Sequence, residues 1–104
     1  MSYDEFWPVY LRAHSKEGTR VLHAVGTLAG SGLFIGALAL QRLDWLIASV
    51  AAAYGLAWGS HFLIEGNRPA TFGHPLWSVY SDLRMIFLML SGGLEAELEK
   101  AGVR

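Results

Sequence analysis

Two apolar stretches, each long enough to cross a bilayer, restrict the folds that this sequence can adopt. Residues 21–40 and 45–64 contain no Asp, Glu, Lys or Arg, and about 20 apolar residues suffice for a membrane-spanning helix. The short polar link 41–44 separates the stretches, so we expect two antiparallel transmembrane helices. Only 16% of the residues are charged, well below the roughly 25% of soluble domains, which agrees with a lipid environment.

The remaining segments predict further helices and complete an all-α architecture. Residues 3–13 predict an N-terminal amphipathic helix on the membrane surface, because apolar residues recur there at helical spacing, at Phe6, Val9, Tyr10 and Ala13. Gly18 should end it, and Thr19 is the expected N-cap of the first spanning helix. Residues 76–90 predict a partial third membrane segment, and residues 94–104 a charged, solvent-exposed helical tail. Residues 1–104 are expected to form a single membrane-embedded domain.

The distribution of charge predicts an orientation in the membrane. Arg12, Lys16 and Arg20 cluster just before the first spanning helix, which favours a cytoplasmic location for this end of the hairpin. The acidic first residues predict no cleaved leader. We therefore expect an integral membrane protein, of the plasma membrane in a bacterium or of the endoplasmic reticulum in a eukaryote. The net charge of -1, without a basic run, gives no indication of nucleic-acid binding.

Two pairs of glycines at four-residue spacing lie in the first spanning helix. The pairs are Gly26 with Gly30, and Gly32 with Gly36. Such spacing lets a second helix approach closely in lipid. The pairs predict tight packing within the hairpin, and they leave open a homo-oligomer.

All four histidines of the chain are expected at one end of the hairpin. His23 and His61 lie about 30 and 27 Å from Leu43, the middle of the link, at about 1.5 Å per residue, and so share one depth. His14 precedes the first spanning helix, and His74 follows the second after a short loop. Because the chain has no cysteine, a metal ion would use histidine and oxygen ligands. The sequence predicts a metal site at these four histidines.

Five further polar residues near this end could take part in such a site. Glu65 and Asp82 are each a candidate metal ligand or acceptor for an imidazole N–H. The alternative for Glu65 is a helix-end charge, and the alternative for Asp82 is a contact with Arg84, Arg68 or water. Arg68 and Arg84 are suited to hold a carboxylate, or equally to contact lipid headgroups. Asn67 is expected to brace the loop behind the metal ligands.

The histidines form part of a longer pattern that covers most of the chain. Its elements are Arg12-Ala-His14, Arg20-x-x-His23-x-x-Gly26, Trp58-x-x-His61-Phe62-x-x-Glu65-Gly-Asn67-Arg-Pro69-Ala-Thr-Phe72-x-His74-Pro75-x-Trp77-Ser78 and Ser81-Asp82-x-x-Met85. This pattern resembles the small membrane 2-hydroxy fatty acid dioxygenases known from fungal phytosphingosine breakdown. The short, compact chain is similar to bacterial relatives in that family.

The resemblance implies a polytopic membrane enzyme that uses Fe(II) and molecular oxygen. Its substrate would be a long-chain 2-hydroxy fatty acid, which is converted at the membrane surface to the acid one carbon shorter. The four histidines would correspond to the essential histidines of the family. Glu65 and Asp82 are the candidate catalytic carboxylates, and Arg68 and Arg84 the candidates for binding the carboxylate of the substrate.

Two other functions also agree with the sequence. A haem-binding membrane protein would use His23 and His61 as axial ligands at equal depth in a helical pair. A non-catalytic membrane adaptor would use its histidines only to satisfy buried polar groups. Metal content and the effect of replacing the histidines separate these possibilities.

Overall fold

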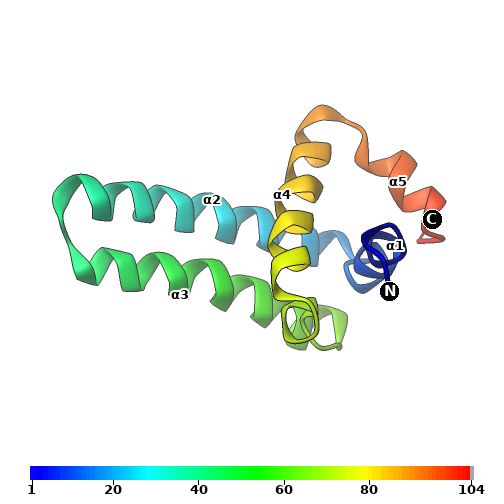
Figure 1. Cartoon of the computed structure of the whole chain (residues 1–104), viewed down its shortest axis with the longest axis horizontal. Coiled ribbons are helices and arrows are strands. Elements are labelled where there is room, and N and C mark those ends of the chain that lie inside the picture. Colours follow the sequence, from blue (N-terminus) through cyan, green and yellow to red (C-terminus); the bar gives the residue numbers. More distant parts are fainter. Residues whose placement is uncertain (104) are drawn as a thin grey trace.

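The chain folds into helices joined by short loops. The computed structural model describes residues 1–103, and that part of the chain contains no strand. A π-helical turn, His61–Glu65, extends the third helix, and a single 3-10 turn, Ala70–Phe72, interrupts the loop that follows. The helices, shown in Figure 1, are α1 (Tyr3–Ala13), α2 (Glu17–Leu40), α3 (Leu43–Ser60), α4 (Pro75–Ser91) and α5 (Leu94–Lys100). The predicted all-α fold is confirmed.

Helices α2 and α3 form the expected antiparallel hairpin, which projects away from the other helices (Figure 1). Gln41 ends α2 in the left-handed conformation, with φ 53°. Gly26 and Gly30 face α3, and a Cβ atom on Gly30 would lie 2.9 Å from the carbonyl oxygen of Ser49. Gly32, by contrast, has open space beside it. The first glycine pair therefore brings the two backbones together.

Both arms of the hairpin are long and apolar enough to cross a membrane. Glu17–Leu40 and Leu43–Glu65 contain windows with mean hydropathy 1.7 and 1.4, and only 22% of the residues in each window are buried. The core helix of a soluble protein would bury most of such a window. Most apolar side chains of the hairpin instead face outwards, as Leu28, Ile35, Leu38 and Ile47 do.

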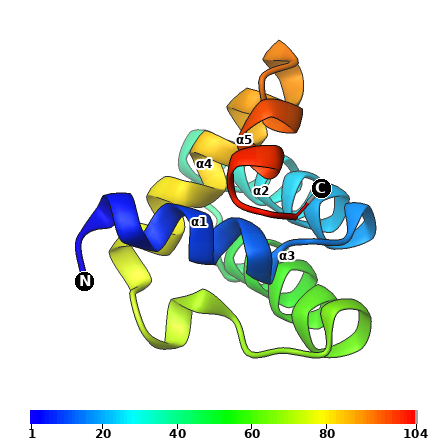
Figure 2. The same cartoon turned by 90° about the vertical axis from the view of Figure 1, so that its right-hand side faces the viewer.

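The other three helices, α1, α4 and α5, form what we call the head unit. Figure 2 shows α1 lying across the end of the hairpin, with α5 beside it and α4 behind it. Their shared core is built from the buried side chains of Phe6, Trp7, Tyr10, Leu11, Met85, Leu94, Leu98 and Ala101.

The head unit corrects two expectations about the ends of the chain. The solvent-exposed tail was predicted wrongly, since Leu94 and Leu98 turn one face of α5 into the core. Helix α1 spans the predicted residues, and Phe6 and Tyr10 of its predicted apolar face are buried. Val9 of that face is 40% exposed, however, and Trp7 and Leu11 are buried in addition. Helix α1 is thus the centre of a small core and not an isolated surface helix.

The start of α2 also differs from the prediction. Lys16 is the N-cap residue, so Gly18 and Thr19 lie inside the helix. The backbone N–H of Lys16 donates a hydrogen bond of 2.5 Å to Glu65, which also accepts one of 3.0 Å from the Ser15 hydroxyl. A carboxylate from the end of the hairpin therefore supplies the acceptor that α2 lacks locally. A negative charge at this position also suits the helix dipole.

Candidate metal centre

Three of the four histidines converge where the head unit meets the hairpin. His14 follows the last residue of α1, His23 lies on α2, and His61 begins the π-helical turn after α3. The Nε2 atom of His14 lies 3.1 Å from that of His23 and 3.0 Å from that of His61. All three side chains are buried. The predicted equal depth of His23 and His61 is confirmed, with ring centroids 5.0 Å apart.

The opposite nitrogen of each ring has a hydrogen-bond acceptor. Nδ1 of His14 lies 2.7 Å from the carbonyl oxygen of Tyr10, and Nδ1 of His23 lies 2.9 Å from that of Thr19. Nδ1 of His61 lies 2.7 Å from Oδ1 of Asn67. Because these oxygens can only accept, each Nδ1 carries the proton and each Nε2 of a neutral ring keeps its lone pair. The candidate ligand atoms of the three rings lie within 4.8 Å of one another, so three lone pairs are brought together at one place.

This arrangement fits a transition-metal ion better than a hydrogen-bonded histidine cluster. Facing lone pairs without a proton between them repel, whereas a cation at their common point attracts all three. Two nitrogens at about 2.1 Å from one ion and at a right angle to each other lie about 3.0 Å apart, and at the tetrahedral angle about 3.4 Å. The two N–N distances agree with the right-angled arrangement. Three protein ligands would leave further coordination positions of the ion open.

Local helix geometry directs the rings. At the end of α1 and within α2, a histidine donates back to the carbonyl four residues earlier, from His14 to Tyr10 and from His23 to Thr19. The π-helical turn starts at His61, where Gly66 donates to the His61 carbonyl at 2.7 Å. A π-helical turn has hydrogen bonds between residues five apart, one more than in an α-helix, and such turns occur often at functional sites. Here the turn coincides with the third histidine and leads into the loop that carries Asn67.

The predicted fourth ligand, His74, is not brought into this group. Within residues 1–103, the group that could hold a metal ion comprises only His14, His23 and His61. His74 is exposed and precedes α4 as its N-cap residue. Its ring stacks on Trp77 at 4.9 Å between centroids and meets the edge of Phe6 at 5.2 Å. Pro75 starts α4 directly after it, and the histidine serves as an aromatic packing residue on the head unit.

The other predicted site residues divide between the histidine group and distant positions. Asn67 holds His61 and also donates to the Ala13 carbonyl at 3.1 Å. Both oxygens of Glu65 are occupied at the start of α2. Arg68 lies over the ring of Phe72, 5.2 Å from its centroid. Neither Glu65 nor Arg68 lines the cavity beside the histidines.

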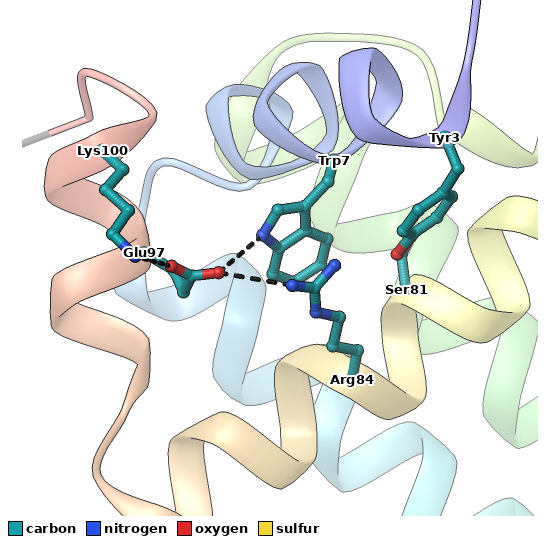
Figure 3. Close-up of polar contacts among 6 residues, drawn as sticks. All are labelled: Tyr3, Trp7, Ser81, Arg84, Glu97 and Lys100. Carbon is teal, nitrogen blue, oxygen red and sulfur yellow. Dashed lines mark hydrogen bonds and ion pairs between the residues drawn. The ribbon is translucent and has the colours of Figure 1, made fainter.

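Arg84 belongs to the head unit. Its guanidinium lies 4.1 Å from the centroid of the Trp7 ring and 3.4 Å from the carboxylate of Glu97 (Figure 3). Trp7 donates to the same carboxylate at 3.2 Å. The charge of Arg84 is therefore used to join α1, α4 and α5, and Arg84 does not line the cavity.

Asp82 is the predicted carboxylate that does face the histidine cavity. This cavity, of about 470 Å³, is lined by Asp82 together with the three histidines and Tyr10. The Tyr10 hydroxyl donates to Asp82, and the Tyr10 ring stacks on His14 with centroids 4.0 Å apart. Tyr10 therefore contacts His14 through both its backbone and its ring. This contact of Tyr10 with His14 was not predicted from the sequence. Its signal was the spacing, because two residues four positions apart lie on the same face of a helix.

Burial adjusts the charges of these residues. Desolvation lowers the pKa of His14 well below its usual value, which keeps the ring in the neutral form that binds metal ions. Burial also raises the pKa of Asp82 to about 6, despite the hydrogen bond from Tyr10. The pKa of Tyr10 is raised well above its usual value, first by burial and then by the charge of Asp82.

Two buried polar groups in residues of the cavity wall have no hydrogen-bond partner among the described residues. These groups are Nε1 of Trp58 and Oγ of Ser78. Buried polar groups are rarely left unpaired, but both atoms are fully buried, so a bound molecule would reach them only if the surrounding side chains moved. The end of the cavity next to the histidines thus combines the three imidazoles with the carboxyl group of Asp82.

Comparison with known families agrees with this site. The family described as 2-hydroxy-palmitic acid dioxygenase Mpo1-like matches residues 1–94. The chain belongs to the Mpo1-like family. The match covers every histidine, together with Asn67 and Asp82, and ends at the first residue of α5. Among curated proteins and solved structures, no match was found for this Mpo1-like chain.

Proposed function

We propose that this protein is an Fe(II)-dependent dioxygenase that shortens long-chain 2-hydroxy fatty acids by one carbon. The observation that carries the proposal is the group of three buried imidazoles, in which Nε2 of His14 lies 3.0 to 3.1 Å from Nε2 of the other two. Membership of the Mpo1-like family supplies the reaction class. When bound, Fe(II) would supply open coordination positions for the 2-hydroxy acid and for oxygen.

The charge of the site favours an anionic substrate. His14, His23 and His61 are neutral when they bind a metal ion, and no carboxylate belongs to the group. A divalent cation held by neutral ligands in a buried site attracts an anion to offset its charge. The carboxylate of a 2-hydroxy acid offers that charge, and its hydroxyl lies within reach of the same ion. Arginines are therefore not needed to hold the substrate.

Asp82 and Tyr10 are suited to handle the hydroxyl group of the substrate. Asp82 faces the cavity, and its raised pKa of about 6 places its protonation change close to neutral pH. Tyr10 donates to this carboxyl group and holds its orientation. Asp82 would accept the hydroxyl proton of the substrate. Asp82 and Tyr10 together would position the head of the substrate against the three histidines.

We further propose that the hairpin spans a membrane and that the histidines lie at its cytoplasmic surface. The outward-facing apolar side chains of α2 and α3 favour the first point. Helix α4 crosses the hairpin in Figure 1 and carries exposed apolar residues on one side, among them Leu76, Leu83 and Leu90. It would lie partly in the membrane beside the site. The basic residues Arg12 and Arg20 support the cytoplasmic orientation.

The alternatives receive less support. The rings of His23 and His61, the axial ligands of the haem alternative, have centroids only 5.0 Å apart. The Nε2 atom of His14 lies within 3.1 Å of the Nε2 atoms of both, so no room is left for a porphyrin between them, which disfavours haem. An adaptor with purely structural histidines would need protons between the facing Nε2 atoms, yet each ring already bonds an acceptor through Nδ1.

The test is metal analysis of anaerobically purified protein, combined with an assay for oxygen-dependent shortening of 2-hydroxy acids. We expect near-stoichiometric iron and a product one carbon shorter. His23→Ala and His61→Ala should lose metal and activity, whereas His74→Ala, the matched control, should keep its metal. Zinc or no metal in active protein would contradict the proposal. Equal loss of metal from His74→Ala and His23→Ala would overturn the assignment to three histidines.

A further inference from the structure

The cavity extends well beyond the histidines, along the hairpin. Its wall contains two rows of residues at four-residue intervals, which lie on one face of each helix. The row on α2 consists of His23, Thr27, Ser31 and Ile35. The row on α3 consists of His61, Ala57, Ala53 and Ser49. We call the space between these rows the hairpin groove.

The hairpin groove changes from polar to apolar along its length. Asp82 and the histidines lie at one end, and apolar residues such as Phe34, Ile35 and Val50 lie at the other. Twelve positions separate His23 from Ile35, which is about 18 Å along a helix. Ile35 is 66% exposed, so the far end opens to the surroundings of the hairpin. Apart from Asp82 and the histidines, the lining contains no Asp, Glu, Lys, Arg or His.

Small residues in the lining keep the groove from being filled by side chains. At Gly30, an added Cβ atom would lie 3.0 Å from Cβ of Ala53. The two helices therefore touch at this point of the lining, and no larger side chain projects from it into the groove. Ala53 and Ala57 continue the α3 row with single methyl groups. Large side chains at these positions would fill the space. A narrow, mainly apolar groove therefore begins at the metal-binding end and leads away from it.

An unbranched hydrocarbon chain with a polar head matches this gradient. Its head would meet the histidines and Asp82, while its tail would bury apolar area along the groove at about 25 cal/mol per Å². We propose that the hairpin groove holds the acyl tail of a single 2-hydroxy acid, and that Thr27, Ser31 and Ile35 mark successive limits on its length. This inference rests on the proposed function. Each step of the α2 row corresponds to about 6 Å of tail.

The first experiment maps the tail directly on the wild-type protein. A long-chain 2-hydroxy acid with a photoreactive diazirine at its terminal carbon is bound and irradiated, and the adducts are located by mass spectrometry. We expect adducts near Ser31, Ile35 and Val50, which excess unlabelled 2-hydroxy acid suppresses. Adducts confined to the head unit would overturn the inference. So would equal labelling by a diazirine phospholipid that the 2-hydroxy acid does not displace, since the groove would then be a bilayer-lipid site.

The second experiment shortens the groove and measures specificity. Thr27→Phe and Ser31→Phe are assayed against unbranched 2-hydroxy acids of increasing length. We expect kcat/KM for the longest acids to fall by about tenfold or more, with the limit at shorter chains for Thr27→Phe than for Ser31→Phe. Short acids should be turned over by both variants. Ala29→Phe is the matched control, because Ala29 is exposed on α2 and does not line the cavity.

The outcomes separate failure of the groove from failure of the proposed reaction. Absence of shortening by the wild-type protein at every chain length would overturn the reaction. Normal turnover, with the same length profile for Thr27→Phe, Ser31→Phe and Ala29→Phe, would overturn the groove alone. If Thr27→Phe does not fold, the exposed position Ser31 and the labelling of wild-type protein still decide the question.

Discussion

Asn67 accepts a hydrogen bond of 2.7 Å from Nδ1 of His61 and thereby sets which nitrogen of that ring is free to bind a metal ion. Its amide nitrogen donates at 3.1 Å to the carbonyl of Ala13, the residue before His14. One side chain thus connects two of the three candidate ligands. Residues in this position orient metal ligands and raise their basicity.

Replacement of Asn67 should therefore weaken metal binding. Asn67→Ala removes both hydrogen bonds, and we expect metal affinity to fall about 10- to 100-fold. Asn67→Asp keeps the acceptor for His61 and should lie closer to the wild type. Competition titration against a chelator measures both variants. Wild-type affinity in Asn67→Ala would show that the bond to His61 does not tune the site.

The raised pKa of Asp82 predicts a pH dependence of stability. Its value of about 6 in the folded protein lies above the usual 3.8, so the folded state binds the proton more tightly than the unfolded state. The contribution of Asp82 to stability is therefore largest at low pH and falls as pH rises from about 4 to 6. The full loss is on the order of 2–3 kcal/mol.

Asp82→Asn isolates this effect from other titrating groups, above all His14, whose lowered pKa acts in the opposite direction. The stability gain of Asp82→Asn over the wild type should grow between about pH 4 and pH 6 and then level off. Thermal unfolding of the metal-free proteins in the same detergent, across this range, measures the difference. A constant difference across that range would contradict a raised pKa.

The two glycines Gly30 and Gly32 should respond differently to the same change. In Gly30→Ala the new methyl group would meet the Ser49 carbonyl at 2.9 Å, and we expect a loss of about 1–3 kcal/mol from overpacking of the hairpin. Gly32→Ala meets nothing within 4 Å and should gain up to about 1 kcal/mol from helix propensity. Thermal unfolding in detergent compares them. Equal effects would mean that the helices do not approach most closely at Gly30.

Arg84 should matter for stability and not for substrate binding. Arg84→Ala removes its contact with the Trp7 ring and its ion pair with Glu97, at a cost of about 1–2 kcal/mol. The KM for a 2-hydroxy acid should stay unchanged, because Arg84 does not line the cavity. Unfolding and steady-state kinetics give the two values. A large rise in KM with unchanged stability would return Arg84 to the substrate site.

The parts of the fold that follow from local pattern could be predicted from sequence. Apolar length predicted the hairpin, and equal distances from the turn predicted the meeting of His23 with His61. Contacts between distant segments could not be predicted in this way. Glu65 was a candidate ligand because it follows His61 by one turn, yet its carboxylate caps α2 at Lys16.

The burial of the C-terminal helix and the placement of His74 could not be predicted for a related reason. Leu98 lies in a charged segment, so its burial depends on where α1 offers an apolar surface. His74 was assigned to the site because it returns to the right end of the hairpin, but position along the membrane normal does not specify the direction of a ring. Its neighbours Phe6 and Trp77 determine that direction.

The position of the histidine group has a mechanical consequence. Two of its members belong to the hairpin and the third, His14, follows the main helix of the head unit. A metal ion held by all three would connect the hairpin to the head unit. The joint between these two bodies would tighten when the ion binds and loosen when it leaves, so the same ion would also hold the two parts of the protein together.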